Sequence, residues 1–199
     1  WGAAFADEHH PLVNRPLSCW SIAMDFRVYG PSPLGPHLTN LLLHLLTGIL
    51  LAWLIYRLLL ARDPQRNATL AAWVALLTTA LWLLHPFNIS TTLYIVQRMA
   101  ILSALFSIAG LLTYVVGRDL LARQPRRAYF LMTAGVVVFT PLAVFSKENG
   151  ALLPLLIAVL EYTALRHPAP QCYPSSRWLM LFLGLPNLIL IVYFAVRWD

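Results

Sequence analysis

Long uncharged runs constrain this chain more than any other feature of its sequence. Residues Ala128–Phe145 are 18 residues without a formal charge, and Asn149–Leu160 are 12 more. A membrane-spanning helix needs about 20 mostly apolar residues. In the whole 199-residue chain 11% of residues are charged, whereas soluble domains carry about 25%. The sequence therefore predicts an all-α, polytopic helical membrane protein.

Six segments are apolar enough to predict membrane spans. They cover approximately residues 37–60, 68–84, 99–117, 128–145, 149–165 and 178–196. Residues 1–36 are polar and rich in proline and glycine, so we expect an extracytoplasmic loop there. Within this loop the stretch Leu17–Val28 is amphipathic and predicts an interfacial helix that lies on the membrane surface, with a plain loop as the alternative.

The arginines predict the orientation of these spans. Nine of the 14 basic residues fall at the links after the first, third and fifth spans, on one face of the bundle. The positive-inside rule makes that face cytoplasmic. Residues 1–36, His85–Gln97 and the turn Ser146–Asn149 then lie outside. This bias accounts for the net charge of +6, and no nucleic-acid partner is expected because no basic helix carries base-stacking aromatics.

Lys147 and Glu148 lie in a very short turn between two apolar runs. Ionisable residues near the membrane usually face a water-filled cavity or one another. The alternative is a charged hairpin tip whose side chains reach out to water.

Further polar residues occur on the same predicted side. His37, Asn40, His44 and Thr47 are spaced by three, four and three residues, which places them on one helix face. We expect this face to look into the bundle or a wet cleft, or to form a hydrogen-bonded stripe between helices. His85 and Gln97 flank the next outer segment and are expected to line the same cleft. No carboxylate shares this face, so we assign no metal site.

The predicted outer face combines cations with carboxylates. Cations at the headgroup level suit an anionic phosphate, and the candidate phosphate ligands are Lys147, Arg98 and Arg15. A nearby carboxylate suits proton abstraction from a hydroxyl acceptor. Glu148 is a candidate for this catalytic set, in which it would orient Lys147 or the acceptor. Together these residues predict glycosyl transfer from a polyprenyl-phosphate sugar.

Three motifs occur in order along the chain. The first is NRPLSCWSIAMDFRVYGPSPLGPHLTNLLLHLL, the second contains LWLLHPFNISTTLYIVQRMA, and the third is FSKENGALLPLLIAVLEY. They resemble the Arg-Pro-Leu and His-x-x-Asn-Leu-Leu-Leu-His run, the His-Pro and Gln-Arg pair, and the Ser-Lys-Glu turn of the transmembrane and tetratricopeptide-repeat O-mannosyltransferases. The Val-Gln-Arg-Met form is nearer to the bacterial relatives of that family.

The resemblance implies a GT-C membrane fold with its active site on the extracytoplasmic face of a bacterial inner membrane. The implied partners are the lipid bilayer, a polyprenyl-phosphate sugar donor and a protein or glycan acceptor, with Ser/Thr hydroxyls of proteins favoured. A divalent metal at the phosphate stays open. The resemblance also implies a span before residue 1 and soluble repeats after the membrane part, so that this stretch is a membrane-domain fragment.

The acidic pair Asp7-Glu8 departs from the family pattern. The family places its catalytic base in an acidic pair well before the Arg-Pro-Leu run, whereas here Asp7 and Glu8 lie close to Arg15. They are candidate catalytic acids of this stretch, although the equivalent pair is expected to lie before residue 1.

Two other function classes stay open on the sequence. A transporter or flippase of lipid-linked saccharides would place ionisable groups or broken helices at the membrane midplane. A non-catalytic membrane scaffold would tolerate replacement of the outer polar residues.

Overall fold

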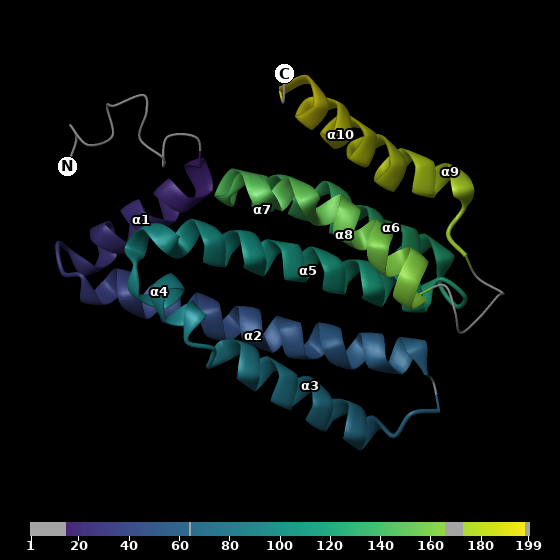
Figure 1. Cartoon of the computed structure of the whole chain (residues 1–199), viewed down its shortest axis with the longest axis horizontal. Helices are drawn as coiled ribbons and strands as arrows, with labels where there is room; N and C mark the ends of the chain where they lie inside the picture. The colour runs from purple at the N-terminus through teal and green to yellow at the C-terminus, as the bar shows by residue number, and fades with distance from the viewer. Residues whose placement is uncertain (1–14, 64, 166–172, 198–199) are drawn as a thin grey trace.

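The computed structural model describes residues 15–63, 65–165 and 173–197. Regular structure in these residues is helical, and this part of the chain contains no strand. Figure 1 shows most of the helices side by side along the long axis of the molecule, with the links between them at its two ends. The predicted all-α, polytopic architecture is confirmed.

The first helices form one edge of the bundle. α1 (Pro16–Tyr29) carries a proline in its first turn, where the missing N–H has no helical partner to lose. α1 ends at Gly30, which adopts a φ of 68° that residues with a side chain rarely reach. The chain then enters the long α2 (Leu34–Arg62) and returns along it as α3 (Ala68–Leu83).

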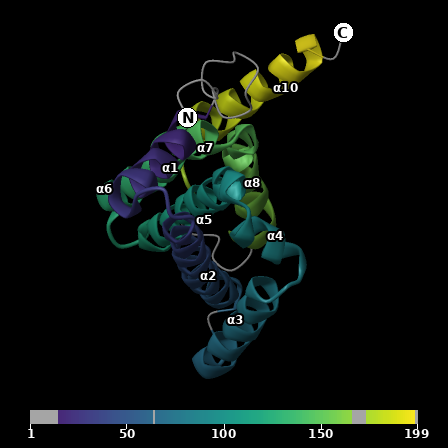
Figure 2. The same cartoon turned by 90° about the vertical axis from the view of Figure 1, so that its left-hand side faces the viewer.

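α5 lies in the middle of the bundle. A short helix α4 (Phe87–Leu93) and the 3-10 turn η2 (Ile95–Gln97) lead from α3 into α5 (Arg98–Leu120). In Figures 1 and 2, α5 runs between α2 on one side and α6, α7 and α8 on the other. The bundle core accordingly includes the fully buried Tyr114 and Val115 of α5.

α6 (Pro125–Val137) and α7 (Phe139–Ser146) are one interrupted helix. Pro141 has no N–H, so it cannot continue the backbone ladder, and the helix breaks just before it. Glycines let α5 and α6 approach closely: a side chain on Gly110 would come within 2.9 Å of the Gly135 carbonyl oxygen. Small residues at such contacts are the usual way in which membrane helices pack.

The last helices are also interrupted. After the 3-10 turn η3 (Glu148–Leu152), α8 (Leu153–Leu160) continues as a π-helical segment, η4 (Glu161–Leu165). α9 (Ser176–Leu179) likewise continues through a second π-helical segment, η5 (Met180–Gly184), into α10 (Leu185–Arg197). η4 and η5 thus interrupt two neighbouring α-helical runs.

The expected number of about six spans is slightly off. In the described residues, four helical stretches are long and apolar enough to cross a membrane: Leu34–Arg62, Ile95–Leu120, Pro125–Ser146 and Glu148–Leu165. The apolar helices Ala68–Leu83 and Ser176–Val192 are shorter. At 1.5 Å per residue, the 16 residues of α3 reach about 24 Å, less than the roughly 30 Å of a bilayer core.

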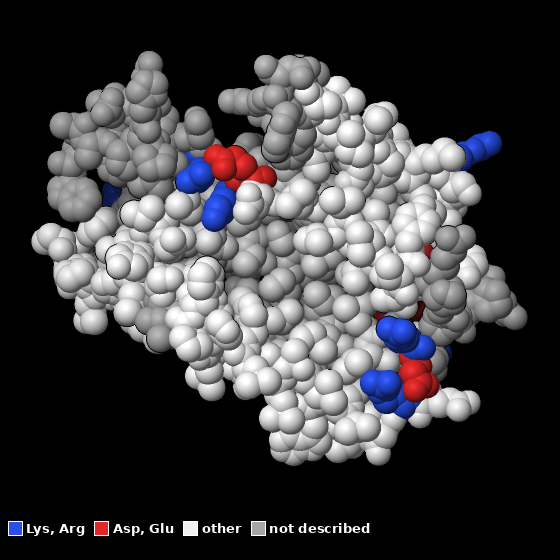
Figure 3. Space-filling model, in the orientation of Figure 1, with Lys and Arg blue, Asp and Glu red and all other residues white. Residues whose placement is uncertain are grey.

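Charged side chains gather at two ends of the molecule. On the face shown in Figure 3, blue and red atoms lie toward the left and right ends, and the described residues drawn between them carry no charged side chain. An apolar band between two charged ends fits an integral membrane protein. Which end faces the cytoplasm, and whether α1 lies on the membrane surface, stay predictions.

Candidate functional site

The Ser-Lys-Glu turn closes the end of the bundle at which α1, α5 and α7 meet. α7 ends at Ser146, and Lys147 adopts an extended conformation before η3 begins at Glu148. The Lys147 N–H donates to the Ala143 carbonyl at 2.9 Å, and the Gly150 N–H donates to the Lys147 carbonyl at 2.9 Å. These bonds fix the backbone on both sides of the lysine.

α1 holds this turn from outside. The Ser18 hydroxyl donates to the Ser146 carbonyl at 3.0 Å in a buried contact. Arg15 Nη2 donates to both carboxylate oxygens of Glu148, at 3.0 and 3.1 Å, and Nη1 lies 2.7 Å from the sulfur of Met99. The Glu148 side chain is still 70% exposed. Glu148 therefore pairs with Arg15, one of the proposed phosphate ligands.

Lys147 is half-buried, and its amine makes no hydrogen bond or ion pair with residues 15–63, 65–165 or 173–197. It is also the single lysine of the 199-residue chain. Among the three cations expected to bind phosphate, it is the one that the described protein leaves available.

Arg98 is buried in the bundle, whereas the sequence predicted a phosphate ligand on the outer face. Its side chain is fully buried and forms an ion pair with Asp25. Its Nε donates to Asn40 Oδ1 at 2.8 Å, Nη2 to the Pro36 carbonyl at 2.8 Å, and Nη1 to Ser21 at 3.2 Å. A buried guanidinium that makes these hydrogen bonds can contact a ligand only after it breaks them. We therefore correct the role of Arg98 from phosphate ligand to structural cation.

The bonds around Arg98 join several elements. The Asn40 amide nitrogen lies 3.3 Å from the carbonyl oxygens of both Thr92 and Tyr94, at the end of α4. The Thr39 hydroxyl donates to Asp25 Oδ1 at 2.9 Å. We call Asp25, Asn40 and Arg98 the buried hub, because these three side chains tie α1, α2, α4 and α5 together.

The expected polar stripe on the first long helix lies inside the bundle. Asn40, His44 and Thr47 are all buried, as the sequence predicted for that face. His44 Nε2 lies 3.4 Å from the Leu83 carbonyl, and its ring is 5.0 Å from that of Trp82. His37 is half-buried, with an Nδ1 that finds no hydrogen-bond partner in the described residues.

His85 and Gln97 lie outside the buried hub. His85 is exposed and accepts a hydrogen bond from the Phe87 N–H at 3.2 Å. With Trp82 and Asn88 it lines a surface hollow of about 380 Å³. Gln97 is half-buried and ends η2 directly before Arg98. In the described residues, no three His, Cys, Asp or Glu side chains are placed to hold a metal ion.

The structure adds partners that sequence analysis missed. Asp25, Ser18 and Met99 were not among the expected site residues. A signal existed in α1: Ser18, Ile22 and Asp25 follow helical spacing and form its buried face, while Trp20 and Met24 are exposed. Ile22, an apolar residue of the predicted amphipathic stretch, is thus buried against the bundle. Asp7 and Glu8 lie outside the described residues.

Known proteins resemble this chain at low identity. It is 28% identical over 176 residues to a Drosophila melanogaster protein named protein O-mannosyl-transferase Tmtc3, covering 81% of this chain and 18% of the relative. It is 28% identical over 114 residues to Drosophila Tmtc1, covering 57% and 12%. It is 21% identical over 161 residues to the Caenorhabditis elegans protein O-mannosyl-transferase F38B6.6, covering 80% and 20%.

The chain spans about a fifth or less of the length of these relatives. No protein-family model and no solved structure matches it. The chain is therefore a membrane-type helical bundle whose weak homologues carry the name of TMTC-type O-mannosyltransferases.

Proposed function

We propose that this chain is part of a GT-C-type membrane glycosyltransferase that moves a sugar from a polyprenyl-phosphate donor to an extracytoplasmic acceptor. The favoured acceptors are Ser/Thr hydroxyls of proteins, in keeping with the names of the weak homologues. The proposed site is the end of the bundle that carries the Ser-Lys-Glu turn.

One observation carries this proposal: a half-buried lysine amine without a partner among the described residues, in the turn between α7 and η3 at the end of an apolar bundle. An ammonium in that place binds a phosphate oxygen by charge-assisted hydrogen bonds. When the sugar leaves its phosphate, negative charge builds up on the phosphate oxygens, and a fixed cation stabilises that charge. We assign Lys147 this role.

The neighbouring groups position the lysine. Arg15 and Ser18 hold the residues on either side of it through Glu148 and Ser146. Arg15 is kept as a proposed phosphate ligand, since its guanidinium contacts Glu148, which follows Lys147 in the chain. The buried hub fixes α1, and hence Arg15, against α2 and α5.

The acceptor hydroxyl also needs a base. Glu148 is exposed but forms an ion pair with Arg15. This pairing favours a positioning role for Glu148 over the role of the base. Asp7 and Glu8 are the proposed source of the base. The proposal also includes a location in a bacterial inner membrane. It further includes a donor site that is bordered by His37, Asn40, His44, His85 and Gln97.

The lysine allows a direct test in the intact protein. Purified protein in nanodiscs is treated with an amine-reactive acyl reagent, with and without polyprenyl phosphate, and Lys147 acylation is measured by peptide mass spectrometry. We expect polyprenyl phosphate to slow the acylation of Lys147 by at least five-fold, and the same lipid without phosphate to have no effect. Equal acylation rates with both lipids would remove Lys147 from the donor site.

A transfer assay in sealed liposomes separates the enzyme from a flippase. Labelled polyprenyl-phosphate sugar and a Ser/Thr-containing peptide are supplied, and both peptide labelling and lipid movement between leaflets are followed. We expect labelled peptide with the wild type and about 100-fold less with Lys147→Ala, within the range that a lost charge-stabilising group costs. Lipid movement without peptide labelling would instead establish a flippase.

A further inference from the structure

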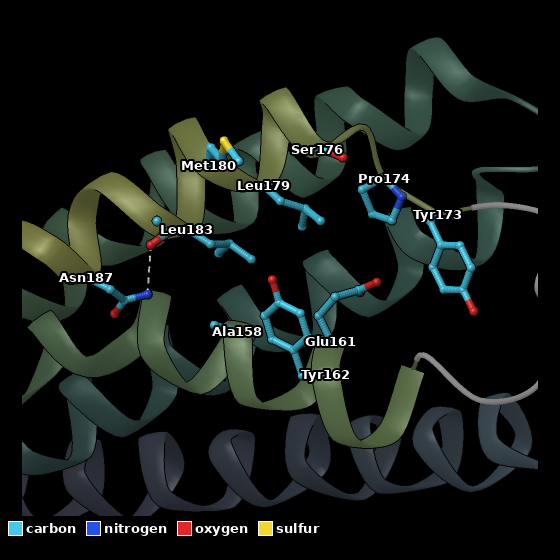
Figure 4. A pocket seen from close by; sticks show the side chains of 11 residues that line it. Ala158, Glu161, Tyr162, Tyr173, Pro174, Ser176, Leu179, Met180, Leu183 and Asn187 are labelled. Carbon is cyan, nitrogen blue, oxygen red and sulfur yellow. Dashed lines mark hydrogen bonds between the residues drawn. The ribbon is translucent and has the colours of Figure 1, made fainter.

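A second cavity lies away from the Ser-Lys-Glu turn, between α8 and η4 on one side and α9, η5 and α10 on the other (Figure 4). Its volume is about 550 Å³, within the range of roughly 300–1,000 Å³ that small-molecule sites occupy. Leu179 and Leu183 point into the gap, and the Tyr162 ring reaches across it from the opposite wall. None of the expected site residues lines this cavity.

The cavity opens to the outer surface of the bundle. Tyr162 and Met180 both line it and are 55% and 72% exposed. Both belong to helices with the composition of membrane segments. The molecules that surround such a surface are lipids, so a lipid is the occupant with direct access.

The polar groups of the cavity carry little net charge. Glu161 is 3% exposed, and its carboxylate accepts hydrogen bonds from Arg118 Nε at 3.1 Å and from the Tyr114 hydroxyl at 2.9 Å. The carboxylate is therefore neutralised by a protein cation. A phosphate in the cavity would face this carboxylate and gain no unpaired cation from the described lining residues.

The Asn187 side chain contains a hydrogen-bond acceptor without a donor in the described residues. Its amide nitrogen donates to the Leu183 carbonyl at 2.8 Å, while Oδ1 is buried and has no hydrogen-bond partner in the described residues. A buried acceptor without a donor costs about 1–3 kcal/mol. A ligand that brings a hydroxyl or amide N–H recovers this loss.

The helix geometry on both walls is unusual. The π-helical segments η4 and η5 supply Glu161, Tyr162, Met180 and Leu183 to the lining. Such segments are rare and occur frequently at functional sites. At the end of η5, a side chain on Gly184 would meet only the Leu179 carbonyl oxygen, at 3.8 Å, so that the wall has room for a larger group.

We propose that this cavity binds a neutral membrane lipid with a free hydroxyl group, such as a diacylglycerol. The hydroxyl donates to Asn187 Oδ1, the glycerol lies among the tyrosines, and the acyl chains leave past Met180 into the bilayer. This site is separate from the donor site proposed above and does not depend on it.

Photo-crosslinking in nanodiscs tests the site on the intact protein. The probes are a diazirine-labelled diacylglycerol, its O-methyl ether, and diazirine-labelled phosphatidic acid. We expect the diacylglycerol to crosslink to peptides within residues 173–187, and unlabelled diacylglycerol to compete. The ether lacks the donor and should label these peptides about 2- to 10-fold less, the equivalent of one hydrogen bond.

Two variants at one position give a matched comparison. Gly184→Leu fills the cavity and should reduce labelling at least five-fold, whereas Gly184→Ala leaves most of the space and should keep it. Asn187→Leu should abolish the difference between diacylglycerol and its ether.

Three results would overturn the proposal. They are equal labelling by all three probes, preferred labelling by phosphatidic acid, and unchanged diacylglycerol labelling of Gly184→Leu. A protein–protein crosslink that excludes the lipid from this cavity would also overturn it, because another helix would then be the occupant.

Discussion

Arg98 Nε donates a hydrogen bond to Asn40 Oδ1 at 2.8 Å, and both side chains are completely buried. This bond joins the start of α5 to α2 and brings Asp25 of α1 into the same cluster. The buried hub therefore sets where α1 lies. Because α1 also carries Arg15 and Ser18, the hub indirectly positions the Ser-Lys-Glu turn.

Breaking the ion pair of the hub should destabilise the protein. Asp25→Asn keeps an acceptor for the Thr39 hydroxyl but leaves the buried guanidinium without a counter-ion. The expected loss is about 3–5 kcal/mol in the free energy of unfolding. Thermal unfolding in detergent, followed by tryptophan fluorescence, measures it.

The matched control is Asp119→Asn, which breaks the pair between Asp119 and Arg57. These side chains are 32% and 29% exposed, so that loss should be about 0–1 kcal/mol. Equal shifts for the two variants would contradict the structural role of the hub.

The pair between Arg15 and Glu148 should matter more for activity than for stability. Glu148 is largely exposed, and such pairs contribute about 0–1 kcal/mol. Glu148→Ala should therefore leave the unfolding temperature nearly unchanged but lower sugar transfer at least ten-fold. The double variant Arg15→Glu with Glu148→Arg should recover part of that transfer. Failure of the swap together with full activity of Glu148→Ala would argue against this pair as a positioning device.

Gly150 should not tolerate a side chain. A Cβ there would overlap the backbone of Ala143 and Val144 in α7, and backbone atoms cannot move aside as a flexible side chain does. Gly150→Ala should cost about 1–3 kcal/mol, the usual range for overpacking, and should displace Lys147. Lower thermal stability and altered Lys147 acylation are the readouts. Gly184→Ala, whose Cβ would meet only the Leu179 carbonyl oxygen at 3.8 Å, is the control that should behave as the wild type.

The orientation of the bundle can be tested with engineered cysteines. Gln65 and Asn149 are exposed at links that the arginine distribution assigns to opposite sides of the membrane. In a background with Cys19→Ser and Cys172→Ser, an impermeant maleimide added to intact cells should label Asn149→Cys and not Gln65→Cys. The reverse pattern, or labelling of both, would refute the predicted topology.

The sequence predicted the architecture because composition and helical spacing are local properties. Uncharged runs predicted the helices, and the spacing of Asn40, His44 and Thr47 predicted a face that lies inside the bundle. The number of spans was slightly off because a run of apolar residues predicts a helix but not that the helix is long enough to cross a bilayer: α3 ends within one residue of its predicted end and has only 16 residues.

The pairing of charged residues was not predictable in the same way. Arg98 looked like a ligand because it is surrounded by uncharged residues in the chain, and its partner Asp25 belongs to a different helix. Glu148 looked like the partner of its neighbour Lys147, but successive residues in a turn point apart, and Arg15 reaches Glu148 from α1. Such pairs depend on tertiary packing, which no local pattern encodes.

The most direct test of the central claim, that Lys147 serves sugar transfer, is intact-protein mass spectrometry of extracytoplasmic proteins. Cells carry the intact gene, a Lys147→Ala copy expressed at the same level, or no gene. We predict a mass increment of hexose type on at least one protein with the intact gene only. Identical spectra from all three strains, or the same increment with Lys147→Ala as with the intact gene, would contradict the account.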